Sequence, residues 1–175
     1  MGKRSRGDSR GAALVELAFA LPILIMLVLG IVSGGIAYNH QLALTHSARE
    51  AGRYAATLPV INFGSMDMWL EEVASRALDE GTGSLDPGAP GLVICVAFVH
   101  PDGSLATDST RTRQEVGGVV TYASGSSCFD DGRPSDERRV QVRVARETTF
   151  NVFVYSSTLT LDSEATNRFE AGVGF

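Results

Sequence analysis

The chain has 175 residues, of which 44% are hydrophobic and 20% are charged, and its formal net charge is −5 at pH 7. The first 11 residues carry four basic side chains and one acidic side chain, which leaves −8 on the remainder. An acidic remainder argues against a broad nucleic-acid surface, and its length suffices for one modest soluble domain.

An uncharged apolar run covers residues 17–38, with Glu16 at its edge and basic residues before it. As a helix, these 22 residues would extend about 33 Å, enough to cross a bilayer core of about 30 Å. The next charged residue is Arg49, so the positive-inside rule predicts a cytoplasmic N-terminus. A secretory signal peptide cleaved near residue 37 is an alternative interpretation of the same run.

The helical pattern continues past the apolar run without a proline until Pro59, and it predicts one long helix over residues 12–57. Spacings of four and three place a stripe of mostly small residues on one face: Leu44, Ala48, Ala51, Ala55 and Leu58. Arg49 and Arg53 lie one turn apart on another face, which we expect to be solvated.

Pairs of small residues at four-residue spacing are candidate contacts between helices of neighbouring subunits. Gly30 and Gly34 form G-x-x-x-G within the apolar run, and Ala48 and Gly52 form a second pair of small residues at the same spacing beyond it. The alternative for Gly30 and Gly34 is that glycine is simply common in membrane helices. A larger side chain at Ala48 or Gly52 would crowd either a neighbouring helix or the chain's own sheet.

A second, shorter helix is predicted over residues 65–81. Ser65 is a suitable N-cap, and Gly81 can end the helix in a left-handed conformation. We expect Trp69 and Met68 in the core, together with the positions at helical spacing: Leu70, Val73, Ala74, Ala77 and Leu78.

Strand patterns follow in the C-terminal half. Residues 92–99 are a buried-strand run, 116–122 a weaker strand, and 138–150 and 157–170 alternate between apolar and polar side chains. We interpret the glycines at 117 and 118 as a bulge or a close approach within a strand. The predicted fold class is α+β, with an antiparallel sheet of three or four strands that packs one face on the long helix and exposes the other to water.

No set of residues in the sequence indicates catalysis, a metal site or a cofactor. The histidines lack partners at metal-ligand spacing, and two cysteines alone cannot form a structural zinc site. Asp130 and Asp131 beside a glycine lack the further oxygen ligands of a calcium loop, so we interpret them as a solvated turn. We therefore expect a protein that is not an enzyme.

Cys95 and Cys128 are the only cysteines, and the predicted topology places both on the extracytoplasmic side. Cys95 fits a buried strand, whereas a free thiol in the glycine- and serine-rich segment around Cys128 would be oxidised there. We predict a disulfide between them.

The segment GAALVE, from Gly11 to Glu16, resembles the processing site of type IV prepilins, with glycine before the cut and glutamate fifth after it. The run RGAALVELAFALPILIMLVLGI, followed by ALTHSAREAGRYAAT, is similar to the TadE-like branch, which comprises pseudopilins or minor pilins of tight-adherence, Flp-type pilus systems. The terminal SEATNRFE is similar to the end of that family's last strand. The tyrosine that usually follows the glutamate in this branch is Leu17 here.

The resemblance implies a cut after Gly11 that exposes the amine of Ala12, whose pKa would be about 7.7–8.0. Glu16 of a neighbouring subunit could pair with that cation in a medium of low dielectric constant and so set the register between helices. The alternative for Glu16 is an ordinary acidic residue at the level of the lipid headgroups.

The sequence thus predicts a minor pilin or pseudopilin that acts by subunit packing. The expected parts are a basic leader (1–11), a transmembrane helix (12–38), its extracytoplasmic continuation (39–58) and an extracytoplasmic α+β domain (59–175). The expected location is the inner membrane, crossed once, or the pilus. Expected partners are other pilins or pseudopilins of the system, a prepilin peptidase, the inner-membrane assembly platform and membrane lipid, but not nucleic acid. The alternative function is an uncleaved single-pass membrane protein with an extracytoplasmic interaction domain in an envelope complex.

Overall fold

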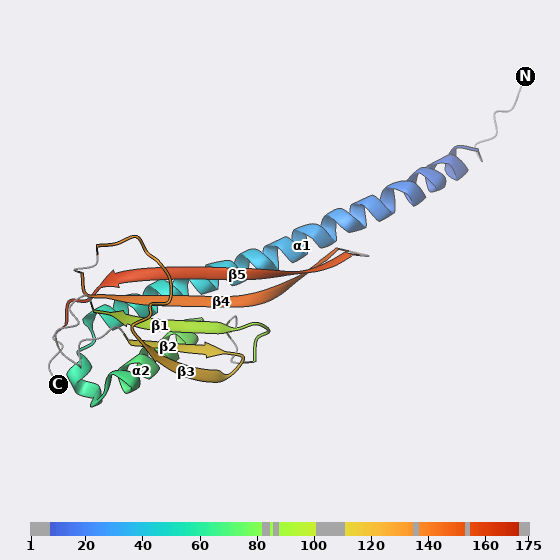
Figure 1. Ribbon diagram of the computed structural model, residues 1–175. Coiled ribbons are helices and arrows are strands. Elements are labelled where there is room, and N and C mark those ends of the chain that lie inside the picture. The colour runs from blue at the N-terminus through green and yellow to red at the C-terminus, as the bar shows by residue number, and fades with distance from the viewer. Residues whose placement is uncertain are drawn as a thin grey trace, which may run out of the picture.

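The computed structural model describes residues 8–81, 85, 88–100, 111–134, 137–152 and 155–171, so residues 1–7 of the expected leader lie outside the described residues. In chain order the elements are α1 (Asp8–Thr57), η1 (Val60–Phe63), α2 (Met66–Glu80), β1 (Val93–Val99), β2 (Arg111–Val116), β3 (Val119–Ser124), β4 (Arg139–Val152) and β5 (Tyr155–Arg168). One sheet lies against the C-terminal part of α1 and α2, while the N-terminal part of α1 projects away from it (Figure 1). The predicted α+β class is confirmed.

α1 is a single helix of 50 residues that continues through Pro22 without a break. The prediction over residues 12–57 is confirmed, and the helix begins four residues earlier. Its predicted stripe faces the core: Leu44, Ala48, Ala51 and Ala55 are fully buried, and Leu58 packs at the edge. Because these side chains are mostly small, the sheet and α2 lie close to the axis of the helix.

The second helix forms as predicted but differs at two positions. The hydroxyl of Ser65 accepts a hydrogen bond from the backbone N–H of Met68 and so caps α2. Gly81 follows the helix with φ −82°, so the predicted left-handed conformation is wrong. Trp69 is fully buried, whereas Met68 is 61% exposed, so the prediction of a core position is wrong for Met68.

The sheet has five strands, all antiparallel, in the order β3-β2-β1-β4-β5, so the prediction of three or four was too low. The additional strand is β2, which pairs with β3 through a two-residue turn. In that turn Gly117 and Gly118 have φ of 57° and 82°. These are the positive values of a hairpin turn, so the glycines are not a bulge within one strand.

The core lies between the inner face of the sheet and the two helices. Alternate residues of β1 and β4 supply it, and the predicted alternation of β4 is confirmed because Val140, Val142 and Val144 are all fully buried. The ring of Trp69 packs edge to face on Phe98, with 5.8 Å between ring centroids. Such a pair of aromatic rings adds specific geometry to the area it buries.

The outer face of the sheet is only partly exposed to water, contrary to the prediction. Residues 125–134 cross it, and Cys128 in that segment forms the predicted disulfide with Cys95 of β1. Ala97 and Gln141, which pair across β1 and β4, are fully buried beneath the crossing segment. The side-chain amide of Gln141 accepts from the backbone N–H of Cys128 at 3.1 Å and donates to the carbonyl of Phe129 at 3.0 Å.

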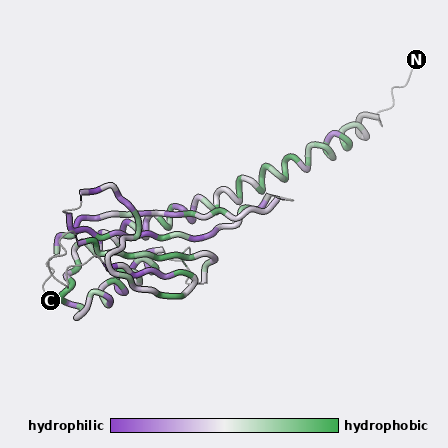
Figure 2. The backbone as a smooth tube through the Cα atoms, in the orientation of Figure 1, coloured by the Kyte–Doolittle hydropathy of each residue, from purple (hydrophilic) through white to green (hydrophobic). Residues whose placement is uncertain are grey.

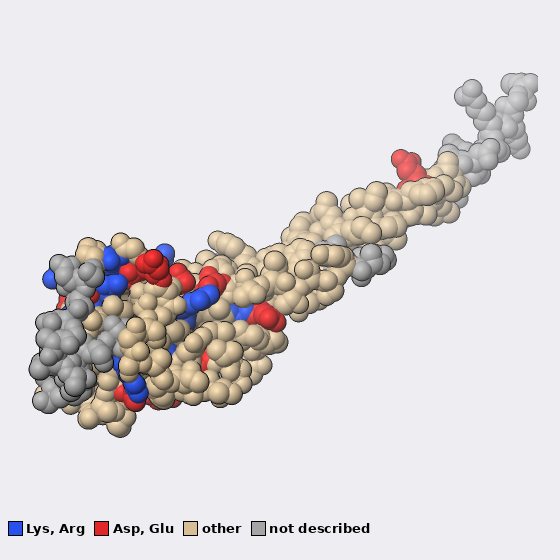
Figure 3. All heavy atoms as spheres, in the orientation of Figure 1, with Lys and Arg blue, Asp and Glu red and all other residues tan. Residues whose placement is uncertain are grey.

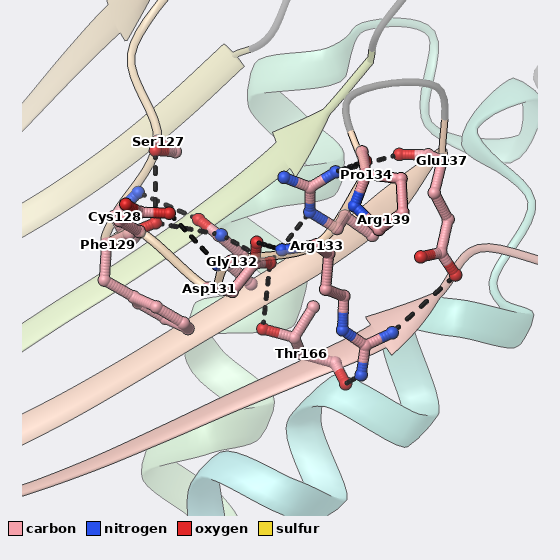
Figure 4. A network of polar contacts seen from close by, with 12 residues as sticks. Ser127, Cys128, Phe129, Asp131, Gly132, Arg133, Pro134, Glu137, Arg139 and Thr166 are labelled. Carbon is pink, nitrogen blue, oxygen red and sulfur yellow. Dashed lines mark hydrogen bonds and ion pairs between the residues drawn. The ribbon is translucent and has the colours of Figure 1, made fainter.

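Asp131 anchors the same segment to the sheet (Figure 4). Its carboxylate accepts hydrogen bonds from Arg139 at 2.8 Å, Gln141 at 2.9 Å and Thr166 at 3.3 Å. Burial alone would raise the pKa of Asp131. Hydrogen bonds from Gln141, from the backbone N–H of Arg133 and from Arg139 outweigh burial and hold that pKa below its ordinary value. The predicted solvated turn is therefore wrong for Asp131, while Asp130 is exposed.

Candidate membrane and assembly helix

The N-terminal half of α1 is the part of the molecule with the clearest functional character. It projects beyond the sheet and is almost continuously hydrophobic (Figures 1 and 2). An 18-residue window of this helix has a mean hydropathy of 2.7, and none of the window is buried inside the protein. A helix of this length and composition can cross a membrane, and apolar side chains that face water at this density would be costly.

Glu16 is the one acidic residue between residues 11 and 49, and Figure 3 shows a single red group on the projecting part of the helix. Gly11, Ala12 and Glu16 are all exposed. No hydrogen bond or ion pair joins Glu16 to any residue that the structure describes. The carboxylate of Glu16 is therefore an exposed charge on the projecting part of the helix.

The two glycines of the G-x-x-x-G motif differ in their surroundings. A side chain at Gly30 would meet nothing within 4 Å, so this position is open to a neighbouring helix. A Cβ at Gly34 would lie 4.0 Å from the ring of Phe150, which belongs to the end of the β4–β5 hairpin. A helix of another subunit that packed on both glycines would therefore also contact the ring of Phe150 at Gly34.

Ala48 and Gly52, the other candidate subunit contacts, lie inside this chain's own fold. Both are buried, and a Cβ at Gly52 would overlap the side-chain amide of Asn167 and come within 3.7 Å of Ala165. Their small size lets β5 pack directly on α1. The structure thus brings them to the helix–sheet contact and leaves Glu16, Gly30 and Gly34 as the candidates for contact between subunits.

A groove on the other side of α1 was not predicted. It has a volume of about 710 Å³ and lies between α1 and the C-terminal end of α2. Its lining carries charges of both signs and one half-exposed leucine: Leu42, His46, Arg49, Glu50, Arg53 and Glu80 are among its residues. The predicted solvation of Arg49 and Arg53 is confirmed, and the mixed charges around them were the signal that could have indicated a groove.

Two carboxylates of α2, Asp67 and Glu71, pair with arginines of the sheet. Arg111 donates to both carboxylate oxygens of Asp67 at 2.6 and 2.8 Å, and this hydrogen bonding is the main reason that the pKa of Asp67 is lowered. Arg113, which is almost completely buried, donates to Glu71 at 2.5 Å and to Glu115 at 2.9 Å. The pKa of Glu71 is lowered chiefly by its hydrogen bond from Arg113. These charges join α2 to β2.

Among the described residues, no group of three or more histidine, cysteine, aspartate or glutamate side chains is placed to hold a metal ion. Of the cysteines, both are consumed by the disulfide.

The comparisons with known proteins concern α1 alone. The family model described as TadE-like protein matches residues 11–53, from the expected processing glycine to Arg53. No curated protein and no solved structure matches the chain. The match ends before η1, α2 and the sheet, so it covers the projecting half of α1 and most of the half that the sheet covers. The expected resemblance is confirmed over residues 11–53: this helix is TadE-like, and it indicates a membrane-anchored protein associated with a tight-adherence pilus system.

Proposed function

We propose that the protein is a minor pilin or pseudopilin of a tight-adherence pilus assembly and secretion system, and that it acts by packing against other subunits rather than as an enzyme. The observation that carries the proposal is an exposed apolar helix whose one acidic side chain, Glu16, is five residues after Gly11 and unpaired among the described residues. The TadE-like match over the same helix supports it.

The chemistry of assembly follows from the charge at Glu16. Cleavage after Gly11 would leave the amine of Ala12 at the new end of the helix, and this amine is largely protonated at neutral pH. Insertion of an ionised carboxylate into the hydrocarbon core of a membrane costs roughly 2.5–3.5 kcal/mol of free energy. The amine of one subunit and the carboxylate of the next would each lower that cost for the other, so pairing would favour docking in a single register.

The topology follows from the same segment. With basic residues before the span, the N-terminus would lie in the cytoplasm and the α+β domain outside it, at the inner membrane. Oxidation of Cys95 and Cys128 to a disulfide is consistent with an extracytoplasmic domain. Pilins or pseudopilins of the same system would pack along α1, where Gly30 is open and the groove between α1 and α2 is unoccupied by this chain. A prepilin peptidase and an inner-membrane assembly platform would be the other partners.

A second candidate is an uncleaved single-pass membrane protein with an extracytoplasmic interaction domain. The observation that favours it is Leu17, because the TadE-like branch usually has tyrosine at this position.

Peptide mass spectrometry of the N-terminus, on protein from native membranes, separates the two. A mature chain that begins at Ala12 supports processing, whereas one that begins at Met1 supports the second candidate. Replacing Gly11 with leucine should leave the full-length chain in the membrane. The matched variant Ala37→Leu blocks cleavage by a signal peptidase instead. A start near residue 38 that this variant abolishes would contradict both candidates.

A further inference from the structure

The β4–β5 hairpin extends well beyond the rest of the sheet. β1 pairs with β4 only as far as Ala145, whereas β4 and β5 remain paired from there to Val152 and Tyr155. This two-stranded extension runs along α1 toward the N-terminal half of the helix (Figure 1). A ribbon of two strands is only marginally stable in water, so its environment must contribute to its stability.

Three contacts fix the extension on α1. His40 Nδ1 lies 2.9 Å from the hydroxyl of Thr148, and the hydroxyl of Ser33 donates to the carbonyl of Asn151 at 2.7 Å. The ring of Phe150 reaches Gly34, as described above. The extension therefore follows α1 from residue 40 to residue 33, about 10 Å along the helix axis.

The extension carries charged residues only at its base, where Arg146 and Glu147 lie on β4. Glu147 and Asp162 bound an uncharged stretch over residues 148–161, and the facing part of α1 is also uncharged. At the base of the extension, the side chain of Gln41 donates a hydrogen bond to the carbonyl of Asp162. The charged residues of the hairpin therefore begin at the level of residue 41, just beyond the apolar part of α1.

The two faces of the extension differ. Strand alternation places Phe150, Tyr155 and Leu159 on the face toward α1, together with Thr148 and Ser157. The other face carries hydroxyl and amide side chains: Thr149, Asn151, Ser156, Thr158 and Thr160. Tyr155 is 64% exposed and Leu159 is 45% exposed, so α1 covers their face of the extension only in part. The apolar face and the exposed apolar side of α1 thus form one continuous surface.

The level of this surface can be compared with the thickness of a bilayer. A span of about 20 residues that starts at Leu17, directly after Glu16, ends at residue 36. Ser33 and Gly34, which hold the end of the hairpin, lie two to three residues inside that limit, a depth of about 3–5 Å. A hairpin in this position reaches the boundary between headgroups and acyl chains, where tyrosine is favoured and hydroxyl groups remain solvated.

We propose that the end of the β4–β5 hairpin is inserted in the interfacial layer of the phospholipid bilayer beside α1, with Phe150, Tyr155 and Leu159 toward the acyl chains. The protein would then be anchored in the bilayer by two segments, α1 and the end of the β4–β5 hairpin. The proposal requires only that α1 spans a membrane, and it does not depend on a role in a pilus.

The test uses the full-length protein in phosphatidylcholine vesicles, with and without lipid brominated near the top of the acyl chains. The chain has one tryptophan, Trp69, which is buried in the domain and serves as the internal baseline. Tyr155→Trp and Leu159→Trp place a second tryptophan on the hairpin. Tyr122→Trp, on the exposed strand β3, is the matched control.

We expect brominated lipid to remove most of the emission that Tyr155→Trp adds, less of that added by Leu159→Trp, and none of that added by Tyr122→Trp. The graded result is expected because Leu159 pairs with Thr148, which contacts His40. Leu159 therefore lies farther from the centre of the bilayer than Tyr155 does. Equal and weak quenching in the three variants would overturn the proposal and show that this face lies outside the bilayer. The near-ultraviolet circular dichroism of each variant establishes that it is folded, and either hairpin variant alone is sufficient for the comparison.

Discussion

Removal of the disulfide between Cys95 and Cys128 should lower the stability of the domain by a large and calculable amount. The sequence separation is 33, so the bridge closes a loop of 34 residues, counting both cysteines. The chain-entropy relation then gives about 3.5–4 kcal/mol at 25 °C, because the cross-link restricts the unfolded chain. The loop contains β2 and β3, so the strands added at the edge of the sheet are those that the bridge holds near β1.

Removal of the disulfide should change the free energy of the folded state itself only slightly. Cys95 is almost completely buried, so replacing it with alanine leaves only a small void in the outer layer. Gln141 and Asp131 still fix residues 125–134 to the sheet by hydrogen bonds, so the double variant should fold. For a domain of this size, the loss corresponds to a fall in Tm of roughly 10–20 °C.

The assay is thermal unfolding of the full-length protein in detergent micelles, followed by near-ultraviolet circular dichroism, for the wild type and for Cys95→Ala/Cys128→Ala. Wild-type protein melted with a reductant is the matched control, and it should reproduce the shift of the double variant. A double variant that melts within a degree or two of the oxidised wild type would refute the reasoning, since the loop would then be equally restricted without the bridge.

Three other substitutions test separate parts of the structure. Glu16→Ala should still insert in the membrane but lose co-purification with partner pilins, while Asp79→Ala, at an exposed position of α2, should retain it; equal recovery of partners would contradict the pairing of charges. Gly52→Leu should lower the free energy of unfolding by about 1–3 kcal/mol through overpacking against β5, measured by denaturant unfolding, whereas Arg49→Leu on the exposed face should have little effect. The pKa of Asp131 is lowered by folding, so its contribution is complete above its unfolded pKa near 4 and is lost as the pH falls through the folded value. Asp131→Asn should therefore make Tm less sensitive to acid, and an unchanged slope of Tm against pH below 5 would show that this carboxylate does not contribute.

The two helices and four of the strands could be predicted from their apolar patterns, which include a continuous apolar run in β1 and an alternation in β4. The 3.6-residue pattern of α1 and α2 and the alternation in β4 each record one face that is removed from water. β2 could not be found in this way. Its sequence, RTRQEV, is charged because Arg111 and Arg113 pair with carboxylates of α2 that lie more than 40 residues earlier in the chain. An ion-paired strand has no apolar alternation, and its partners are not apparent from the local sequence.

The candidate site was predicted in part. The spacing of Gly11 and Glu16 and the apolar run were evident in the sequence, and both lie on the projecting helix. Small residues along the helix did not indicate which face would receive the sheet, so Ala48 and Gly52 were assigned to contact between subunits although β5 occupies that face. The hairpin that reaches Ser33 was hidden for a related reason. Its position depends on the register between β4 and β5, which local composition does not determine.

The orientation of the domain relative to the membrane follows from how the sheet is attached to α1. The helix has no break between Asp8 and Thr57, so the half within the domain and the apolar half are one rigid element. The sheet contacts it closely at Gly52 and again at Ser33, two points that are 19 residues apart, or about 28 Å along the axis. Two separated contacts resist rotation of the sheet about the helix, whereas one contact would permit it. Any force on the domain would therefore be transmitted to the apolar helix.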